Sequence, residues 1–184
     1  MDKKEVSRRE VETRLKTMGD YVKIDYLQRV LKEKTDFDTR KFVLNTLASL
    51  YENKAMFAEA AKLMNASAEI NATFHGKMND YSKSGELFIK SGDFVNADIA
   101  YGKAIACGEG VQKVQIKEKK KTAYMMQAEI LSSKDRRKHA MMIYEKILTF
   151  DLNQTERRMI QDKLLKLYEK LGKVNEFFNL KKSM

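Results

Sequence analysis

Residues 81–105 read YSKSGELFIKSGDFVNADIAYGKAI, and this stretch carries the clearest structural pattern in the chain. Large apolar residues recur in it at helical spacing, and small residues hold fixed places between them. Gly92 and Asp93 interrupt the pattern, and glycine accepts the positive φ of a helix C-cap at little cost. The stretch therefore predicts two helices joined by a tight turn, with the small residues Gly85 and Ala97 where the helices cross.

Three other segments repeat this order of large and small residues. The large residues that match Phe88 are Tyr51, Leu131 and Tyr168, and the four are separated in chain order by 37, 43 and 37 residues. A single helix pair cannot bury both of its faces, so neighbouring pairs must stack. The remaining members of the three copies are Leu44, Leu47, Ala48, Phe57, Ala60 and Met64; Tyr124, Ala128, Ala140, Tyr144 and Leu148; and Leu164, Leu165, Gly172, Val174 and Phe177.

These copies resemble the tetratricopeptide-type helix–turn–helix repeat. The resemblance implies an all-α fold, a right-handed α-solenoid of about four to five stacked antiparallel helix pairs in a single domain over residues 1–184. Proline often closes each repeat in this family, but this chain has none. We expect residues 36–38, 108–110 and 151–153 to break the helices instead. The approximate helix pairs are 5–35, 39–72, 77–107, 111–150 and 154–182.

Composition narrows the class of protein. Hydrophobic residues make up 43% of the chain, which is ordinary for a folded protein. Cys107 is the only cysteine, which excludes an intramolecular disulfide and a cysteine-based zinc site. The N-terminus lacks the apolar stretch of a secretory signal, and no window approaches ~18 uninterrupted apolar residues. We therefore expect a soluble, cytoplasmic protein.

The chain is basic, with a formal net charge of +10, which raises the possibility of a nucleic-acid partner. Much of the excess lies in two clusters, Lys117–Lys121 and Lys134–Lys138. Such runs are usually solvated faces, and the aromatic residues that could stack on bases hold core positions of the repeat. An RNA or ribonucleoprotein accessory factor is therefore the alternative function. Its phosphate contacts would be Lys117, Lys119, Lys120, Lys121, Lys134, Arg136, Arg137 and Lys138.

The resemblance also implies a concave groove lined by the first helix of each pair. The family's peptide clamp is not matched, so binding of a chaperone's acidic tail is not inherited. The lysine and asparagine positions of that clamp hold residues such as Ser49, Thr122 and Met126 instead. The methionines could line the groove or simply fill the core. The groove residues are predicted to be Asn45, Ser49, Lys83, Glu86, Met125, Met126 and Glu129, followed in the last repeat by Met159, Asp162, Lys163, Lys166 and Glu169.

No motif indicates an enzyme. The Gly108–Gly110 segment lacks the glycine-lysine pair of a P-loop, and His75 and His139 are the only histidines. We predict no catalytic residue, cofactor or metal. Repeats of this kind present binding surfaces, so we predict a non-enzymatic protein–protein interaction adaptor or scaffold that binds a partner peptide or helix in the groove. Weak self-association through the end helices is a further possibility.

Overall fold

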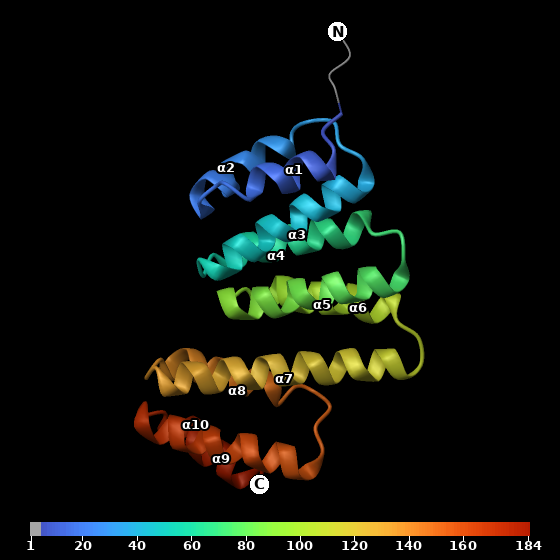
Figure 1. The fold of residues 1–184 in the computed structure, drawn as a ribbon. Coiled ribbons are helices and arrows are strands. Elements are labelled where there is room, and N and C mark those ends of the chain that lie inside the picture. Colours follow the sequence, from blue (N-terminus) through green and yellow to red (C-terminus); the bar gives the residue numbers. More distant parts are fainter. Residues whose placement is uncertain (1–4) are drawn as a thin grey trace. The chain divides into compact units, whose positions relative to one another are not determined.

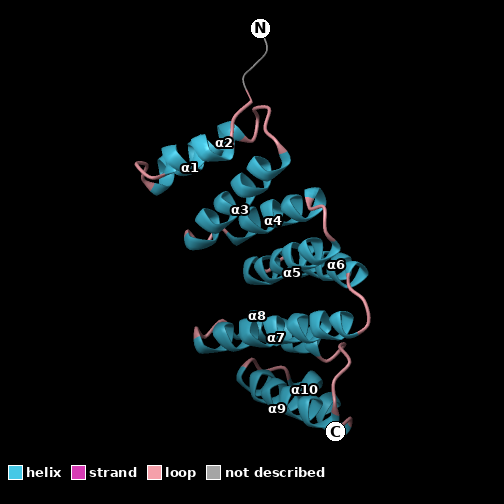
Figure 2. Ribbon diagram, turned by 45° about the vertical axis from the view of Figure 1, so that its right-hand side comes forward, coloured by secondary structure: helices cyan, strands magenta, loops and turns pink. Residues whose placement is uncertain are grey.

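The protein is all-helical in the computed structural model, which describes residues 5–184 (Figure 1). These residues form ten α-helices and no strand, apart from an isolated bridge between Val6 and Thr35 (Figure 2). No helix in this range is both long and apolar enough to cross a membrane. The helices are α1 (Arg8–Leu15), α2 (Asp20–Val30), α3 (Phe37–Asn53), α4 (Phe57–Ile70), α5 (Phe74–Ser91), α6 (Phe94–Cys107), α7 (Val111–Ser133), α8 (Arg137–Ile147), α9 (Gln154–Lys170) and α10 (Val174–Lys182).

The chain divides into two compact units, and the boundary falls inside α7. Unit 1 ends at Lys117 and contains α1 to α6, and unit 2 begins at Glu118 and contains α8 to α10. The interpretation of residues 1–184 as a single domain stays a prediction, and residues 1–4 lie outside the described range.

Polar caps set where α3 and α5 begin, and they correct two predicted bounds. Asp36 accepts a hydrogen bond from the Thr39 amide at 2.6 Å, and Thr73 accepts one from the Gly76 amide at 3.0 Å. Such caps satisfy backbone amides that have no partner within the helix. The helices start two and three residues before the approximate predicted bounds 39 and 77, and Asp36 lies at the interruption between α2 and α3, where the segment 36–38 was expected to break the helices. Gly92 ends α5 with φ of 85°, as its position in the pattern predicts.

Within unit 1, α3 packs against α4, α4 against α5, and α5 against α6. Gly85 on α5 faces the ring of Tyr101 on α6 so closely that a Cβ at Gly85 would lie 2.6 Å from it. Tyr101 is buried, and burial raises the pKa of its hydroxyl. The predicted small residues Ala48, Ala60 and Ala97 are buried as well. Small side chains therefore allow close approach where the sequence predicts it.

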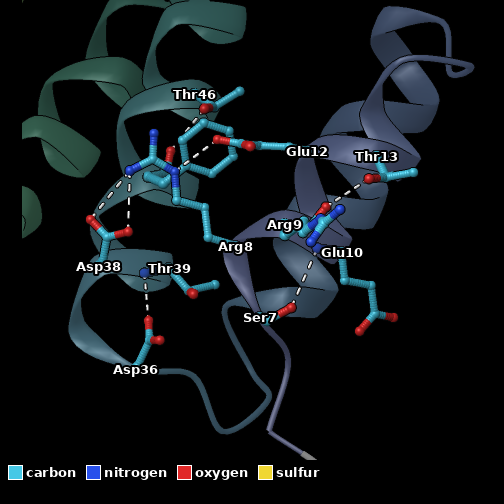
Figure 3. A network of polar contacts seen from close by, with 11 residues as sticks. Ser7, Arg8, Arg9, Glu10, Glu12, Thr13, Asp36, Asp38, Thr39 and Thr46 are labelled. Carbon is cyan, nitrogen blue, oxygen red and sulfur yellow. Dashed lines mark hydrogen bonds and ion pairs between the residues drawn. The ribbon is translucent and has the colours of Figure 1, made fainter.

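A cluster around Arg8 joins α1 to α3 (Figure 3). The guanidinium donates to both carboxylate oxygens of Asp38, at 3.1 and 3.3 Å, and to Glu12 at 2.8 Å. It also lies 4.8 Å from the centre of the Phe42 ring. Each of these exposed contacts is weak by itself, but together they hold one guanidinium in place.

Within unit 2, α8 packs against α9, and α9 against α10. Tyr124, in the second half of α7, is buried and meets Phe150 edge to face, with ring centres 5.3 Å apart. Ile143 of α8 and Leu164 of α9 are fully buried. None of the residues of α10, all of which are described, is buried.

Two tyrosines at the same place in the sequence pattern make similar contacts. The hydroxyl of Tyr51 accepts a hydrogen bond from Gln28, and the hydroxyl of Tyr168 donates one to Glu145. Both partners lie 23 residues before the tyrosine. Three ion pairs also join residues 34 apart, about the length of one helix pair. These pairs are Asp20–Lys54, Glu69–Lys103 and Glu129–Lys163.

The contact between Gly85 and Tyr101 generates a stability prediction with an internal control. Gly85→Ala should destabilise the fold by ~1–3 kcal/mol, because the added methyl group overpacks the crossing. A Cβ on Gly102 would meet no described atom within 4 Å beyond its own helix and neighbours. Gly102→Ala should therefore stabilise by up to ~1 kcal/mol through helix propensity. Urea unfolding of both variants measures the difference, and equal effects would contradict the crossing geometry.

Candidate functional site

The unit 1 residues of the predicted groove lie on α3 and α5. Asn45 and Ser49 line an open hollow of about 400 Å³ together with Leu15, Lys23 and Leu50. The Asn45 side-chain oxygen is buried and has no hydrogen-bond partner among the described residues. The lining of this hollow is largely neutral, with one cation, so it favours no particular partner chemistry.

Lys83 and Glu86, the other two predicted groove residues of unit 1, belong to an ion network between α3 and α5. Lys83 and Lys90 both lie 3.0 Å from the same carboxylate oxygen of Glu52, and Lys90 lies 2.7 Å from Glu86. Burial would raise the pKa of Glu52, but hydrogen bonds from Lys83 and Lys90 hold it below its ordinary value. Two carboxylates thus neutralise two lysines, which leaves little net charge for a partner.

In unit 2, two ion pairs connect α7 to α9. Lys121 of α7 lies 2.6 Å from Glu156 of α9, and Glu129 of α7 lies 2.6 Å from Lys163 of α9. The pair that lies nearer the start of α7 also lies nearer the start of α9, and the two pairs are separated by similar numbers of residues along both helices. The two helices therefore run side by side in the same direction, as the first helices of successive repeats would.

The pair nearer the start of α9 also helps to begin that helix. Asn153 accepts a hydrogen bond from the Glu156 amide at 2.9 Å, and Glu156 accepts one from the Asn153 amide at 3.0 Å, which makes a capping box. Lys121 is only 8% exposed, and hydrogen bonds to Glu118 and then Glu156 raise the pKa of its ammonium group. Lys121 is therefore a structural cation, which corrects its prediction as a phosphate contact.

The most pronounced candidate site lies along α9. An open hollow of about 680 Å³ is lined by α9 alone, and a second of about 260 Å³ lies where α7, α8 and α9 meet. The two hollows share Lys163 and Lys166. We call their α9 lining the α9 surface, which consists of Gln154, Thr155, Arg158, Met159, Asp162, Lys163, Lys166, Leu167 and Lys170.

The charges of the α9 surface are only partly neutralised. Burial would lower the pKa of Lys163, but the hydrogen bond to Glu129 raises it above its ordinary value. Arg158, Lys166 and Lys170 are exposed, and none of them forms an ion pair within the described part of the chain. Asp162 is the only unpaired carboxylate on this surface among residues 5–184. Three exposed cations against one carboxylate give the surface an excess of positive charge.

Exposed methionines flank these charges. Met126 is 58% exposed on α7, one helical turn from Glu129, and Met159 is 38% exposed on the α9 surface itself. Met125 is half-buried. An exposed methionine offers a flexible apolar contact. Their exposure argues against core packing for both Met126 and Met159, but only Met159 lines one of the two hollows.

The remaining predicted phosphate contacts differ in their surroundings. Lys120 lies 4.9 Å from the centre of the Phe150 ring, and Arg137 pairs with Asp135 at 2.6 Å. Lys117 is the last residue of unit 1, whereas the others belong to unit 2. The exposed members are Lys117, Lys119, Lys134, Arg136 and Lys138.

The sequence predicted some residues of the α9 surface and missed others. Met159, Asp162, Lys163 and Lys166 were expected as lining, but Arg158 and Lys170 were not. Both could have been found from their spacing, since residues four apart share a helix face. The described residues contain no group of three or more His, Cys, Asp or Glu side chains that could hold a metal ion.

Comparisons with known proteins identify no family. No family model and no curated protein matches the chain. Of solved structures, 21 chains match. One is the crystal structure of BtubC (BKLC) from P. vanneervenii, at 15% sequence identity and a TM-score of 0.41, over 93% of this chain and 74% of that chain.

The capping box generates a pH-dependent stability prediction. Hydrogen bonds from Lys121 and then from the Asn153 amide hold the pKa of Glu156 below its ordinary value of 4.5. Ionised Glu156 therefore stabilises the fold above the unfolded-state pKa, and the contribution disappears as the pH falls through the lower native value. Glu156→Gln should cost about 1 kcal/mol at pH 7, since both side chains of the pair are partly buried.

Urea unfolding between pH 7 and pH 3 measures this difference. The two proteins should become equally stable near the acid end. Glu169→Gln provides the control, because Glu169 is exposed on the same helix and forms no ion pair within residues 5–184. A constant gap between wild type and Glu156→Gln across the range would contradict the ionic role of Glu156.

Proposed function

We propose that the helix pairs within each unit are tetratricopeptide-like repeats, and that the protein is a non-enzymatic adaptor that binds an acidic segment of a partner protein on the α9 surface. The observation that carries this proposal is the pair of adjoining hollows that share Lys163 and Lys166. Repeats of this class present extended binding surfaces, and no catalytic arrangement competes for these residues.

The repeated contacts support the assignment to this class of repeat. Tyr51 and Tyr168 hold the same position in the pattern, and each reaches a polar side chain 23 residues earlier. The parallel course of α7 and α9 is the arrangement expected of first helices in successive repeats. Small residues at the crossings, such as Gly85 against Tyr101, fit the close packing of such pairs.

Charge and exposure together indicate the chemistry of the partner. Arg158, Lys166 and Lys170 are available to carboxylates of an incoming segment, because no residue in the described range neutralises them. Met159 adds an apolar contact that adapts to the shape of a partner side chain. An acidic segment with at least one apolar side chain therefore fits this surface best.

A nucleic-acid partner fits the α9 surface less well, because Asp162 and Glu129 place negative charge beside the lysines. Salt dependence separates the two partners. For single-stranded RNA, log K falls with log salt concentration with a slope of about −0.7 per phosphate contact. A peptide held by a few carboxylates and an apolar contact should lose affinity less steeply.

Charge reversal on α9 tests the proposal. Labelled peptides that the wild-type protein selects from a random 12-residue library serve as ligands in fluorescence anisotropy titrations. The double variant Lys166→Glu, Lys170→Glu should bind them roughly tenfold more weakly, because two exposed attractions become repulsions. The control is Arg157→Glu, which makes the same kind of change on the opposite face of α9. The proposed function would be refuted if the double variant and Arg157→Glu lowered the peptide affinity equally, or if the wild-type protein selected no peptides at all.

A methionine substitution tests the apolar part of the site. Met159→Glu should weaken binding of the same peptides about threefold or more, since it replaces an apolar contact of the α9 surface by a like charge for an acidic ligand. Met142→Glu is the matched control, because Met142 on α8 is 52% exposed and lines neither hollow. Unchanged affinity and unchanged melting temperature for Met159→Glu would remove Met159 from the site.

A further inference from the structure

Four charged residues on α9 form a row. Arg158, Asp162, Lys166 and Lys170 follow one another at intervals of four residues, and all four are exposed. Residues four apart lie on nearly the same face of a helix, with steps of ~6 Å along its axis. Each step also turns ~40° about the axis, so the row presents the charges +, −, + and + in order along a stripe that winds gradually around α9.

We propose that this row selects the order of charges in the partner, and that Asp162 is its specificity-determining residue. The partner segment would carry acidic, basic, acidic and acidic residues in the complementary order, with its single lysine or arginine opposite Asp162. This inference rests on the proposed function, because it specifies the acidic segment that the α9 surface binds.

The spacing of the row restricts the partner's sequence. A partner helix places residues four apart at the same ~6 Å step, so its charges would recur at every fourth position. An extended segment places residues two apart at ~6.6–6.8 Å, so its charges would recur at every second position. The charge spacing of either segment matches the axial spacing of the row, whereas acidic residues scattered at random do not match it.

The carboxylate of Asp162 is available to a partner. It forms no ion pair with Arg158 or Lys166 in the described part of the chain, and exposed pairs at this spacing are weak in any case. A partner's cation can therefore bind it at little cost. A carboxylate or a phosphate at the same place would meet a like charge, and repulsion of this kind is a common means of excluding wrong partners.

Met159, next to the charged row, adds an apolar contact to the recognition of the partner peptide. Met159 lines the same hollow as Arg158 and Asp162. An apolar side chain of the partner, next to the partner's lysine or arginine, would cover Met159. A nucleic-acid strand repeats negative charge at every phosphate and offers no cation to Asp162, so the row disfavours it. The partner is therefore a mixed-charge peptide with an acidic excess rather than a polyanion.

The test is a selection followed by direct titration. A random 16-residue phage library, long enough to hold four charges at every fourth position, is selected against the wild-type protein and against Asp162→Lys. Peptides from the wild type should share acidic residues and one lysine or arginine at a fixed spacing of two or four residues from them. Peptides from Asp162→Lys should carry an acidic residue at that position instead.

Two synthetic peptides from this selection, identical except for Lys or Glu at the basic position, then serve as labelled probes. The wild type should prefer the Lys peptide by about fivefold. Asp162→Asn should bind the two peptides equally, and Asp162→Lys should prefer the Glu peptide. Asp151→Lys, at an exposed position in the turn before α9, should keep the wild-type preference. Asp162→Asn preserves the size of the side chain. Its peptide preference therefore still tests the role of Asp162 even if Asp162→Lys disturbs folding.

The outcomes separate this inference from the proposed function. Acidic peptides with no fixed basic position, still dependent on Lys166 and Lys170, would overturn the inference and leave the proposed function standing. A preference for the Lys peptide that survives in Asp162→Lys would overturn it too. An absence of acidic peptides, or tighter binding of a labelled 12-nucleotide uridine RNA than of the selected peptides, would overturn both.

Discussion

Close approach between helices is possible in unit 1 because small residues stand at the crossings. The ring of Tyr101 occupies the space that a Cβ at Gly85 would need, so α5 and α6 can pack at a distance that larger residues would prevent. Buried Ala60 and Ala97 have the same function in α4 and α6. A helix pair with bulk at these positions could not bury its apolar stripe against its neighbour, and the repeat would lose its core.

In unit 2 the alignment of α7 with α9 depends on charge as well as on packing. The pairs Lys121–Glu156 and Glu129–Lys163 fix how α7 lies along α9, and they use up four charges in doing so. The charges that remain on the α9 surface are those of Arg158, Asp162, Lys166 and Lys170. The ion pairs that align the helices therefore also decide which cations of this surface stay without a carboxylate partner among the described residues.

Helix content could be predicted from the sequence, but some helix ends could not. Apolar spacing located the interiors of α3 and α5 correctly, because that spacing reflects which side faces the core. It placed the start of each helix too late, because the capping residues Asp36 and Thr73 are polar and carry no apolar signal. For the site, the resemblance predicted Lys163 and Lys166 as lining, and the four-residue spacing on α9 could have added Arg158 and Lys170, but only the hollows show that all four line one surface.

The sequence by itself determined that the chain forms amphipathic helices, that Gly92 ends α5, and that small residues mark the helix crossings. These features depend on neighbours within about one helical turn. Only the tertiary structure decided which of many lysines are neutralised. Lys121 and Lys166 look alike in the sequence, but the first reaches Glu156, 35 residues away, whereas the second meets no carboxylate in the described residues. Such pairs form between separate helices, so their existence depends on how the helices lie against each other.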